Sequence, residues 1–294
     1  MLTYFQAIIL GIVQGVSELF PVSSLGHSVI LPALLGWNID QGADFFLTFL
    51  VATHFATALV LFIYFWKDWK KIIWGLLRSI KNITMVNDPD ARLGWLLLLG
   101  TVPAGLVGLV FQSRVQALFA SPKYVSIFLF CNGIVLFIAE YLGKRNTANG
   151  IKPSAEAAKT DGSANARLSA LSWKNSFKVG ISQALALIPG FSRTGSAIGG
   201  GLLVGMSHED AARFAFLLAT PIIGGAALLK LPHFLLHLHS YPAGPIVVGA
   251  LFAALGAYFS VKFLLKFFKT KTLAPFAVYC ILAGGACAAF FFFK

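Results

Sequence analysis

Long stretches without charge constrain this chain most strongly. Residues 45–66, 93–113, 241–261 and 273–293 contain no Lys, Arg, Asp or Glu, and each reaches the roughly 20 residues that a transmembrane helix needs. Residues 124–139 and 214–229 are shorter and can span with flanking side chains that snorkel to the interface. With 57% hydrophobic and 12% charged residues, the chain is predicted to be an all-α polytopic membrane protein with six transmembrane helices.

A polar motif inside apolar sequence occurs twice. Residues 11–27 read GIVQGVSELFPVSSLGH, and residues 180–196 read GISQALALIPGFSRTGS. The aligned pairs are Gly11 with Gly180, Gln14 with Gln183, Pro21 with Pro189, and Ser24 with Ser192. Such a duplication suggests two related halves that build one site at their interface. We expect one integral membrane domain over 1–294, with a first half over about 1–142, a cytoplasmic linker over about 143–173 and a second half over about 174–294.

Each motif reads as a broken helix. An apolar stretch ends at Pro21 or Pro189 and is followed by a second short helix rich in Ser and Gly. Broken helices at membrane depth occur where they line a cavity enclosed by protein. We therefore predict two re-entrant helix–loop–helix hairpins in inverted-topology repeats, in addition to the six spans.

The basic residues are distributed unequally between the two sets of loops. One set holds four: Arg114, Lys123, Lys230 and Lys294. The other set holds 17: Lys67, Lys70, Lys71, Arg78, Lys81, Arg92, Lys144, Arg145, Lys152, Lys159, Arg167, Lys174, Lys178, Lys262, Lys266, Lys269 and Lys271. The positive-inside rule then places the second set in the cytoplasm and both termini outside it. The charge is spread over separate loops, so nucleic acid is not expected as a partner.

Residues 66–83 interleave Trp, Ile and Lys, a pattern that suits a helix lying along the membrane surface. The three cysteines, Cys131, Cys280 and Cys287, fall inside predicted spans and suggest neither a disulfide framework nor a metal site.

The first motif carries an acid, a serine and a histidine. Glu18 is the only acidic residue before residue 37, and a charge at membrane depth usually marks function. Gln14 lies one helical turn earlier, on the same face. Ser24 and His27 are three residues apart and form a possible nucleophile–base pair. The alternatives are that Glu18 caps a helix near the surface and that Ser24 and His27 serve ordinary helix capping.

The second motif carries a single cation. Arg193 interrupts an uncharged run over 179–206, and its planar fork of donors suits phosphate. The alternative is a structural ion pair with Glu18 across the two halves. His54 lies in the middle of a span, where a buried hydrogen-bonded histidine is expected in preference to a catalytic one.

Over these residues the chain resembles the undecaprenyl-pyrophosphate phosphatase family associated with bacitracin resistance. The family motifs stand here as QGVSELFPVSSLGH over 14–27 and PGFSRTG over 189–195. The similarity extends through 62–68 and 205–221, hence over most of the chain. The resemblance implies hydrolysis of a C55 polyprenyl diphosphate to its monophosphate, which renews the lipid carrier for cell-wall synthesis. It also implies a location in the bacterial plasma (inner) membrane.

The resemblance also implies the roles of individual residues. Glu18, Ser24, His27 and Arg193 are the expected catalytic residues, with Ser24, His27 or water as the nucleophile. Substrate binding is expected at six further positions: Gln14, Ser23, Gly26, Ser192, Thr194 and Gly195. The resemblance makes a divalent cation (Mg or Ca) a possible cofactor, and the better-known members carry Glu at the Gln14 position. A neutral amide contributes no negative charge to a cation, so metal coordination through Gln14 is not expected, although Gln14 can donate to phosphate.

The expected partners are the polyprenyl diphosphate lipid and the phospholipid bilayer, and a homo-oligomer is left open. The competing function is a transporter or flippase for the polyprenyl phosphate lipid, because inverted repeats with broken helices also build transporters.

Overall fold

The computed structural model describes residues 2–82, 86, 88–119, 121–148, 163–236 and 242–293, with the side chains of 111–119 and 230–236 excepted. Within these ranges the chain is helical and contains no strand. The helices are α1 (Tyr4–Leu19), α2 (Ser24–Leu34), α3 (Asp44–Tyr64), α4 (Trp66–Lys81), α5 (Pro89–Phe119), α6 (Pro122–Ala148), α8 (Ala164–Ser169), α9 (Trp173–Gln183), the 3-10 turn η2 (Ala184–Leu187), α10 (Arg193–Leu203), α11 (His208–Leu236), α12 (Ala243–Phe267) and α13 (Ala274–Phe293).

The prediction of six spans is confirmed. In the described part of the chain, six helices are long and apolar enough to cross a bilayer, namely α3, α5, α6, α11, α12 and α13. Each overlaps one predicted stretch, including the two short ones. These two are parts of longer helices, α6 and α11. The fold class is therefore an all-α, multi-pass membrane protein.

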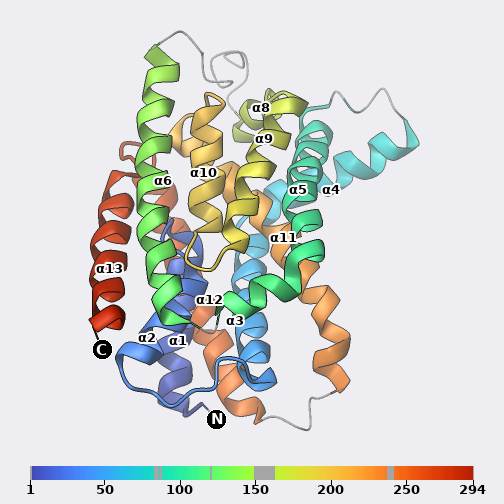
Figure 1. Ribbon diagram of the computed structural model, residues 1–294. Coiled ribbons are helices and arrows are strands. Elements are labelled where there is room, and N and C mark those ends of the chain that lie inside the picture. The colour runs from blue at the N-terminus through green and yellow to red at the C-terminus, as the bar shows by residue number, and fades with distance from the viewer. Residues whose placement is uncertain are drawn as a thin grey trace.

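The two motifs form two hairpins that enter the bundle from opposite ends (Figure 1). The first, α1 followed by α2, begins at the end of the molecule where both termini lie. The second, α9 with η2 followed by α10, begins at the end that carries α8. Their turns meet in the middle of the bundle, which is the arrangement expected of inverted repeats.

Each hairpin packs against a long helix of the other half. Helix α1 packs on α12, and α9 packs on α5. A Cβ atom on Gly11 would collide with the backbone of Gly249, and a Cβ atom on Gly180 would collide with the backbone of Gly100. Small residues let helices approach closely in a membrane, so these four glycines make the same kind of contact twice, once for each hairpin.

The residues at which α2 and α10 begin correct one pair in the sequence alignment of the two motifs. Helices α2 and α10 are each 11 residues long, and their N-caps are Ser23 and Ser192. Ser192 therefore corresponds to Ser23, and Arg193 takes the position of Ser24. The sequence alignment was wrong here because it was drawn through the two prolines, which lie in turns that differ by one residue.

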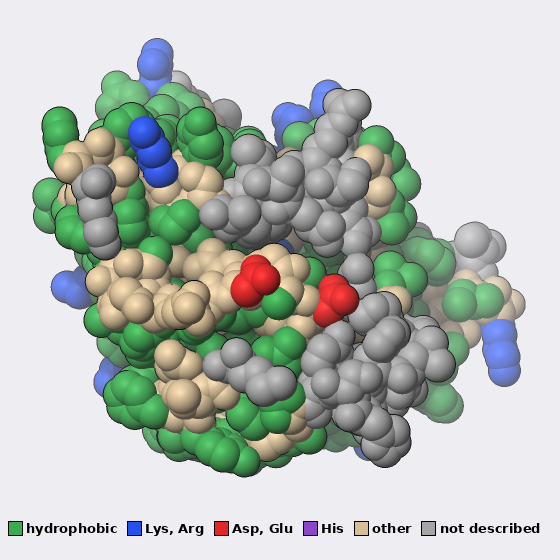
Figure 2. All heavy atoms as spheres, turned by 60° about the horizontal axis from the view of Figure 1, so that its bottom comes forward, with side chains coloured by type: hydrophobic (Ala, Val, Ile, Leu, Met, Phe, Trp, Pro, Cys, Tyr) green, Lys and Arg blue, Asp and Glu red, His purple; other side chains and the backbone are tan. Residues whose placement is uncertain are grey.

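The end of the bundle that carries the termini has few basic side chains on its described surface. Figure 2 shows the end that carries the termini, where the described surface is mainly hydrophobic, with acidic side chains near its middle and only scattered basic ones.

At the opposite end, part of the predicted linker is ordered: α6 continues to Ala148, and Arg167 of α8 pairs with Asp210 of α11 at 3.0 Å. Linker residues 149–162 lie outside the described residues.

Candidate active site

The carboxylate of Glu18 lies where the two hairpin turns meet. Helix α1 ends at Leu19, one residue after Glu18, and the chain then turns through Pro21 before α2 begins. The side chain of Glu18 is 5% exposed. In addition, Thr194 of α10 donates a hydrogen bond to the backbone carbonyl of Glu18 at 2.8 Å. The end of one hairpin is thus tied directly to the start of the other.

Donors surround both carboxylate oxygens of Glu18. The hydroxyl of Ser24 donates to Oε2, and the amide of Gln14 donates to the same atom at 3.1 Å. Arg193 donates from Nη2 to Oε1 at 2.8 Å. Because Ser24 and Arg193 each occupy the first position of a helix, the carboxylate faces two helix N-termini, where backbone N–H groups and the helix dipole favour an anion.

One donor nitrogen of Arg193 is unpaired within the described residues. Its Nη1 is buried and, within the described residues, has no hydrogen-bond partner. An unpaired buried donor is costly, and a phosphate oxygen would satisfy it. The predicted alternative, an ion pair with Glu18, is present in this structure, and it places the arginine beside the carboxylate without using all of its donors.

His54 joins this cluster, although the sequence favoured a structural role for it. Its Nε2 lies 3.3 Å from Oε2 of Glu18, and its Nδ1 lies 2.7 Å from the carbonyl oxygen of Leu50. Both neighbours are acceptors, so the geometry suits an imidazolium that donates from both nitrogens. The repeat could have indicated this residue, because Thr53 aligns with Thr220 whereas the next position is His54 in one half and Pro221 in the other.

The imidazole of His27 has hydrogen-bond partners other than the Ser24 hydroxyl. Its Nδ1 is 2.6 Å from the carbonyl oxygen of Ser23, and its Nε2 is 2.7 Å from the hydroxyl of Tyr279, with the two rings stacked. Both ring nitrogens are therefore engaged. A spacing of three residues places Ser24 and His27 on the same side of α2. The imidazole nevertheless bonds to Ser23 and Tyr279 and not to the Ser24 hydroxyl.

Five of the six predicted substrate-binding residues lie at the starts of the two short helices, and the sixth, Gln14, lies on α1. Ser23 accepts a hydrogen bond from the amide of Gly26 at 3.2 Å, and Ser192 accepts one from the amide of Gly195 at 3.0 Å. These are N-cap bonds, which leave the amides at the first positions of each helix to face an anion. Ser23 has φ 65°, a strained value for a residue with a Cβ atom, and such strain often marks functional turns.

Asn132 of α6 connects the two turns. Its Nδ2 donates to the carbonyl of Pro21 at 3.2 Å, and its Oδ1 accepts from the amide of Ser192 at 3.0 Å. The residue is 1% exposed. A buried amide in the middle of a span was the available sequence indication, because such residues are rare in apolar helices and usually bond across helices.

The described residues provide no preformed metal centre. Among them, no group of three or more His, Cys, Asp and Glu side chains is close enough to hold an ion. Glu18 already uses both oxygens, and Gln14 offers only Oε1 as an uncommitted acceptor within the described residues. The site therefore does not fit a resident divalent cation held by protein carboxylates.

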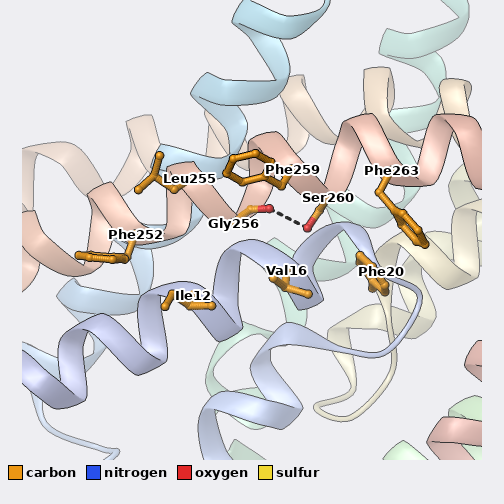
Figure 3. A pocket seen from close by; sticks show the side chains of 9 residues that line it. All are labelled: Ile12, Val16, Phe20, Phe252, Leu255, Gly256, Phe259, Ser260 and Phe263. Atoms are coloured by element: carbon orange, nitrogen blue, oxygen red, sulfur yellow. Dashed lines mark hydrogen bonds between the residues drawn. The ribbon is translucent and has the colours of Figure 1, made fainter.

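An apolar groove lies on the opposite face of α1. It has a volume of about 400 Å³ and is lined by Ile12, Val16, Phe20, Phe252, Leu255, Gly256, Phe259, Ser260 and Phe263 (Figure 3). The lining residues of α1 recur every four positions and alternate with Gln14 and Glu18, so they face away from the carboxylate. With one hydroxyl, which bonds to the Gly256 carbonyl, the groove cannot neutralise a charged substrate.

Fold and site together define a class: an inverted-repeat membrane protein with a buried carboxylate–arginine–serine cluster between two helix N-termini. The sequence profile of the family described as "Bacitracin resistance protein BacA" matches residues 7–286. The chain belongs to this family, and it is accordingly a multi-pass protein of the bacterial inner membrane.

Curated relatives match over nearly the whole chain. A protein of Mycolicibacterium paratuberculosis named "Undecaprenyl-diphosphatase" is 41% identical, covering 97% of this chain and 96% of that protein. One of Acidiphilium cryptum with the same name is 42% identical, covering 96% of each. One of Chromobacterium violaceum named "Undecaprenyl-diphosphatase 2" is 42% identical, covering 95% of each.

Proposed function

We propose that this protein is an undecaprenyl-diphosphate phosphatase. It hydrolyses the C55 polyprenyl diphosphate to the monophosphate and inorganic phosphate, and so recycles the lipid carrier of cell-wall synthesis. One observation carries the proposal. The Ser24 hydroxyl donates a hydrogen bond to one carboxylate oxygen of Glu18, and Arg193 donates to the other. The Nη1 group of Arg193 has no partner within the described residues and can bind a phosphate oxygen. The names of the relatives supply the substrate.

In the proposed reaction, Ser24 is the nucleophile and Glu18 is the base. The Ser24 oxygen attacks the terminal phosphorus, its proton passes to Glu18, and the bridging P–O bond breaks to release the polyprenyl phosphate. Glu18 gives this proton to the departing polyprenyl phosphate and is a carboxylate again. It then takes a proton from water as the water oxygen attacks the phosphoserine; the bond between Ser24 Oγ and phosphorus breaks, Glu18 returns the proton to Oγ, and inorganic phosphate leaves. Between the two bases that the sequence left open, the hydrogen-bond geometry favours Glu18, because His27 is engaged elsewhere.

Arg193 and the two helix N-termini bind the phosphates in this proposal. They stabilise the charge on the equatorial oxygens in the transition state. When the diphosphate enters, it competes with Glu18 for Arg193, and this leaves the carboxylate free to accept the serine proton.

The decisive experiment is phosphate release by the purified protein in detergent. With C55 polyprenyl diphosphate as substrate we expect inorganic phosphate and polyprenyl monophosphate in equal amounts. A folded protein that binds this lipid without releasing phosphate, yet moves polyprenyl phosphate across a vesicle bilayer, would refute the phosphatase and support the transporter.

The proposed topology places both termini and the opening of the site outside the cytoplasm, with the linker inside. It is supported by the excess of basic residues at the end of the bundle opposite the termini. A cysteine introduced at residue 155 should be protected from impermeant thiol reagents in intact cells and should react after lysis. Labelling of this cysteine in intact cells would contradict the proposed topology and indicate the opposite orientation.

A further inference from the structure

Helix α4 departs from the direction of the transmembrane helices. It leaves α3 at the end of the molecule opposite the termini and runs sideways, away from the bundle (Figure 1). Five of its 16 residues are basic, and its only acid is Asp68. A helix placed crosswise at the end of the spans lies at the depth of the membrane–water interface, so its side chains meet both lipid tails and headgroups.

One face of α4 is fixed to the bundle. Trp69, Ile72, Gly75 and Ser79 are buried, and Ser79 accepts a hydrogen bond from the indole of Trp95 on α5 at 2.9 Å. Asp68 lies on the same face and pairs with Arg213 of α11 at 2.8 Å. The orientation of α4 about its own axis is therefore set by the protein rather than by the solvent.

The remaining circumference divides into an apolar and a basic sector. With about 100° per residue and Trp69 at zero, the buried residues fall between about 240° and 360°. The exposed apolar residues fall between about 20° and 80°; they are Ile80, Ile73, Trp66 and Leu77, exposed by 69%, 40%, 51% and 48%. The basic residues fall between about 100° and 200°; they are Lys70, Lys81, Lys67, Arg78 and Lys71, all exposed. Trp74, which is 64% exposed, lies among them at about 140°.

The apolar sector continues a surface that already faces lipid. Ile63, Leu59 and Phe55 of the adjoining span α3 are exposed by 62%, 46% and 46%. Phe62 of α3 also contacts the ring of Trp66 at the start of α4. Lipid tails that cover the end of α3 therefore also reach the apolar sector of α4.

We propose that α4 is an interfacial helix that binds the headgroups of anionic phospholipids through its basic sector. The apolar sector sets the depth of the helix, and the five cations then lie at the level of the lipid phosphates, where each attracts an anionic headgroup. Arg78 also pairs with Asp88 at 3.7 Å, which leaves four lysines as the main contacts. This inference does not depend on the proposed reaction, because it uses no residue of the catalytic cluster.

The test compares two variants that lose the same charge at the same end of the protein. Lys67, Lys70, Lys71 and Lys81 are changed to Gln in the first variant. Lys262, Lys266, Lys269 and Lys271, which are also exposed, are changed to Gln in the second. Each protein is extracted from bilayers of equal parts phosphatidylglycerol and phosphatidylcholine, and the two lipids that remain bound are quantified.

We expect the ratio of retained phosphatidylglycerol to phosphatidylcholine to fall by about tenfold in the α4 variant, and much less in the second variant. A third variant with the four α4 lysines changed to Arg should retain the wild-type ratio. An unchanged ratio in the α4 variant would refute the proposal, and so would equal losses in both Gln variants. If the fourfold change prevents folding, Lys67→Gln/Lys71→Gln and Lys70→Gln/Lys81→Gln replace it, and the same outcomes decide.

Discussion

The two hairpins start their second helices in the same way and place different chemistry at the same position. In both, a serine N-cap precedes an 11-residue helix, and the serine oxygen accepts the amide three residues on. The first helical position is Ser24 in one hairpin and Arg193 in the other, and both donate to Glu18. Duplication thus brings two anion-attracting helix ends face to face, and divergence at one position gives a nucleophile opposite a cation.

The hairpins also differ in how they form their turns. The first takes positive φ at Ser23, whereas the second takes it at Gly190, where a Cβ atom would lie 2.6 Å from the carbonyl oxygen of Val125. The strain in the first turn falls on the residue next to the proposed nucleophile. The second turn is shaped by close packing on α6. This difference suggests that the first hairpin carries out the chemistry and the second positions the charge.

The largest effect is expected at the proposed nucleophile. Ser24→Ala should lower phosphate release by about 10⁴-fold or more, because the hydroxyl makes the new bond. Binding of the lipid diphosphate should persist, since Arg193 and the helix termini supply most of it. Turnover and binding are measured on purified protein. Near-normal turnover of a folded Ser24→Ala protein would disprove the serine mechanism, and a phosphohistidine trapped at His27 would name a different nucleophile.

The equivalent position of the second hairpin should give a different phenotype. Arg193→Ala should weaken substrate binding and lower turnover by about 10²- to 10³-fold, the usual effect of losing a transition-state donor. Arg193→Lys should stay impaired, because a point charge does not reproduce the planar fork. Steady-state kinetics of both variants test this. Wild-type rates in both would remove Arg193 from phosphate binding.

A smaller effect is expected at His54, which only the first half possesses. His54→Gln keeps a donor towards Glu18 but loses the charge, and a hydrogen bond between charged groups contributes about 1.5–3 kcal/mol. We therefore expect turnover to fall by about 10- to 100-fold, with little change in KM. His208→Gln is the matched control, because His208 contacts Glu140 at 2.8 Å outside the catalytic cluster. Equal losses in the two variants would indicate a general effect on stability.

The smallest effects are expected on stability, and they should be equal for the matching glycine substitutions in the two hairpins. Gly11→Ala and Gly180→Ala each place a methyl group against the backbone of a facing glycine, and overpacking costs about 1–3 kcal/mol of stability. Thermal unfolding in detergent should show similar shifts for both. A large shift for one alone would show that the two hairpins, despite their shared plan, are held with different strength.

The sequence predicted the spans well because a bilayer allows few solutions for uncharged stretches of this length. It also predicted that Glu18, Ser24 and Arg193 converge, since the repeat requires two related turns to share an interface. It did not predict the partners of His27 and Asn132. Tyr279 is far from His27 in the sequence, and Asn132 acts through backbone groups of both turns, so neither contact has a local pattern.

The exchange of packing partners between the halves has a consequence for biosynthesis. Helix α1 is made before the other described helices, yet the surface that receives its glycine face, α12, follows most of them in the chain. Helix α9, by contrast, emerges after its partner α5 and can dock at once. The first hairpin must therefore remain within the insertion machinery, or be sheltered by lipid, until the second half arrives, and a chain arrested after α6 cannot complete it.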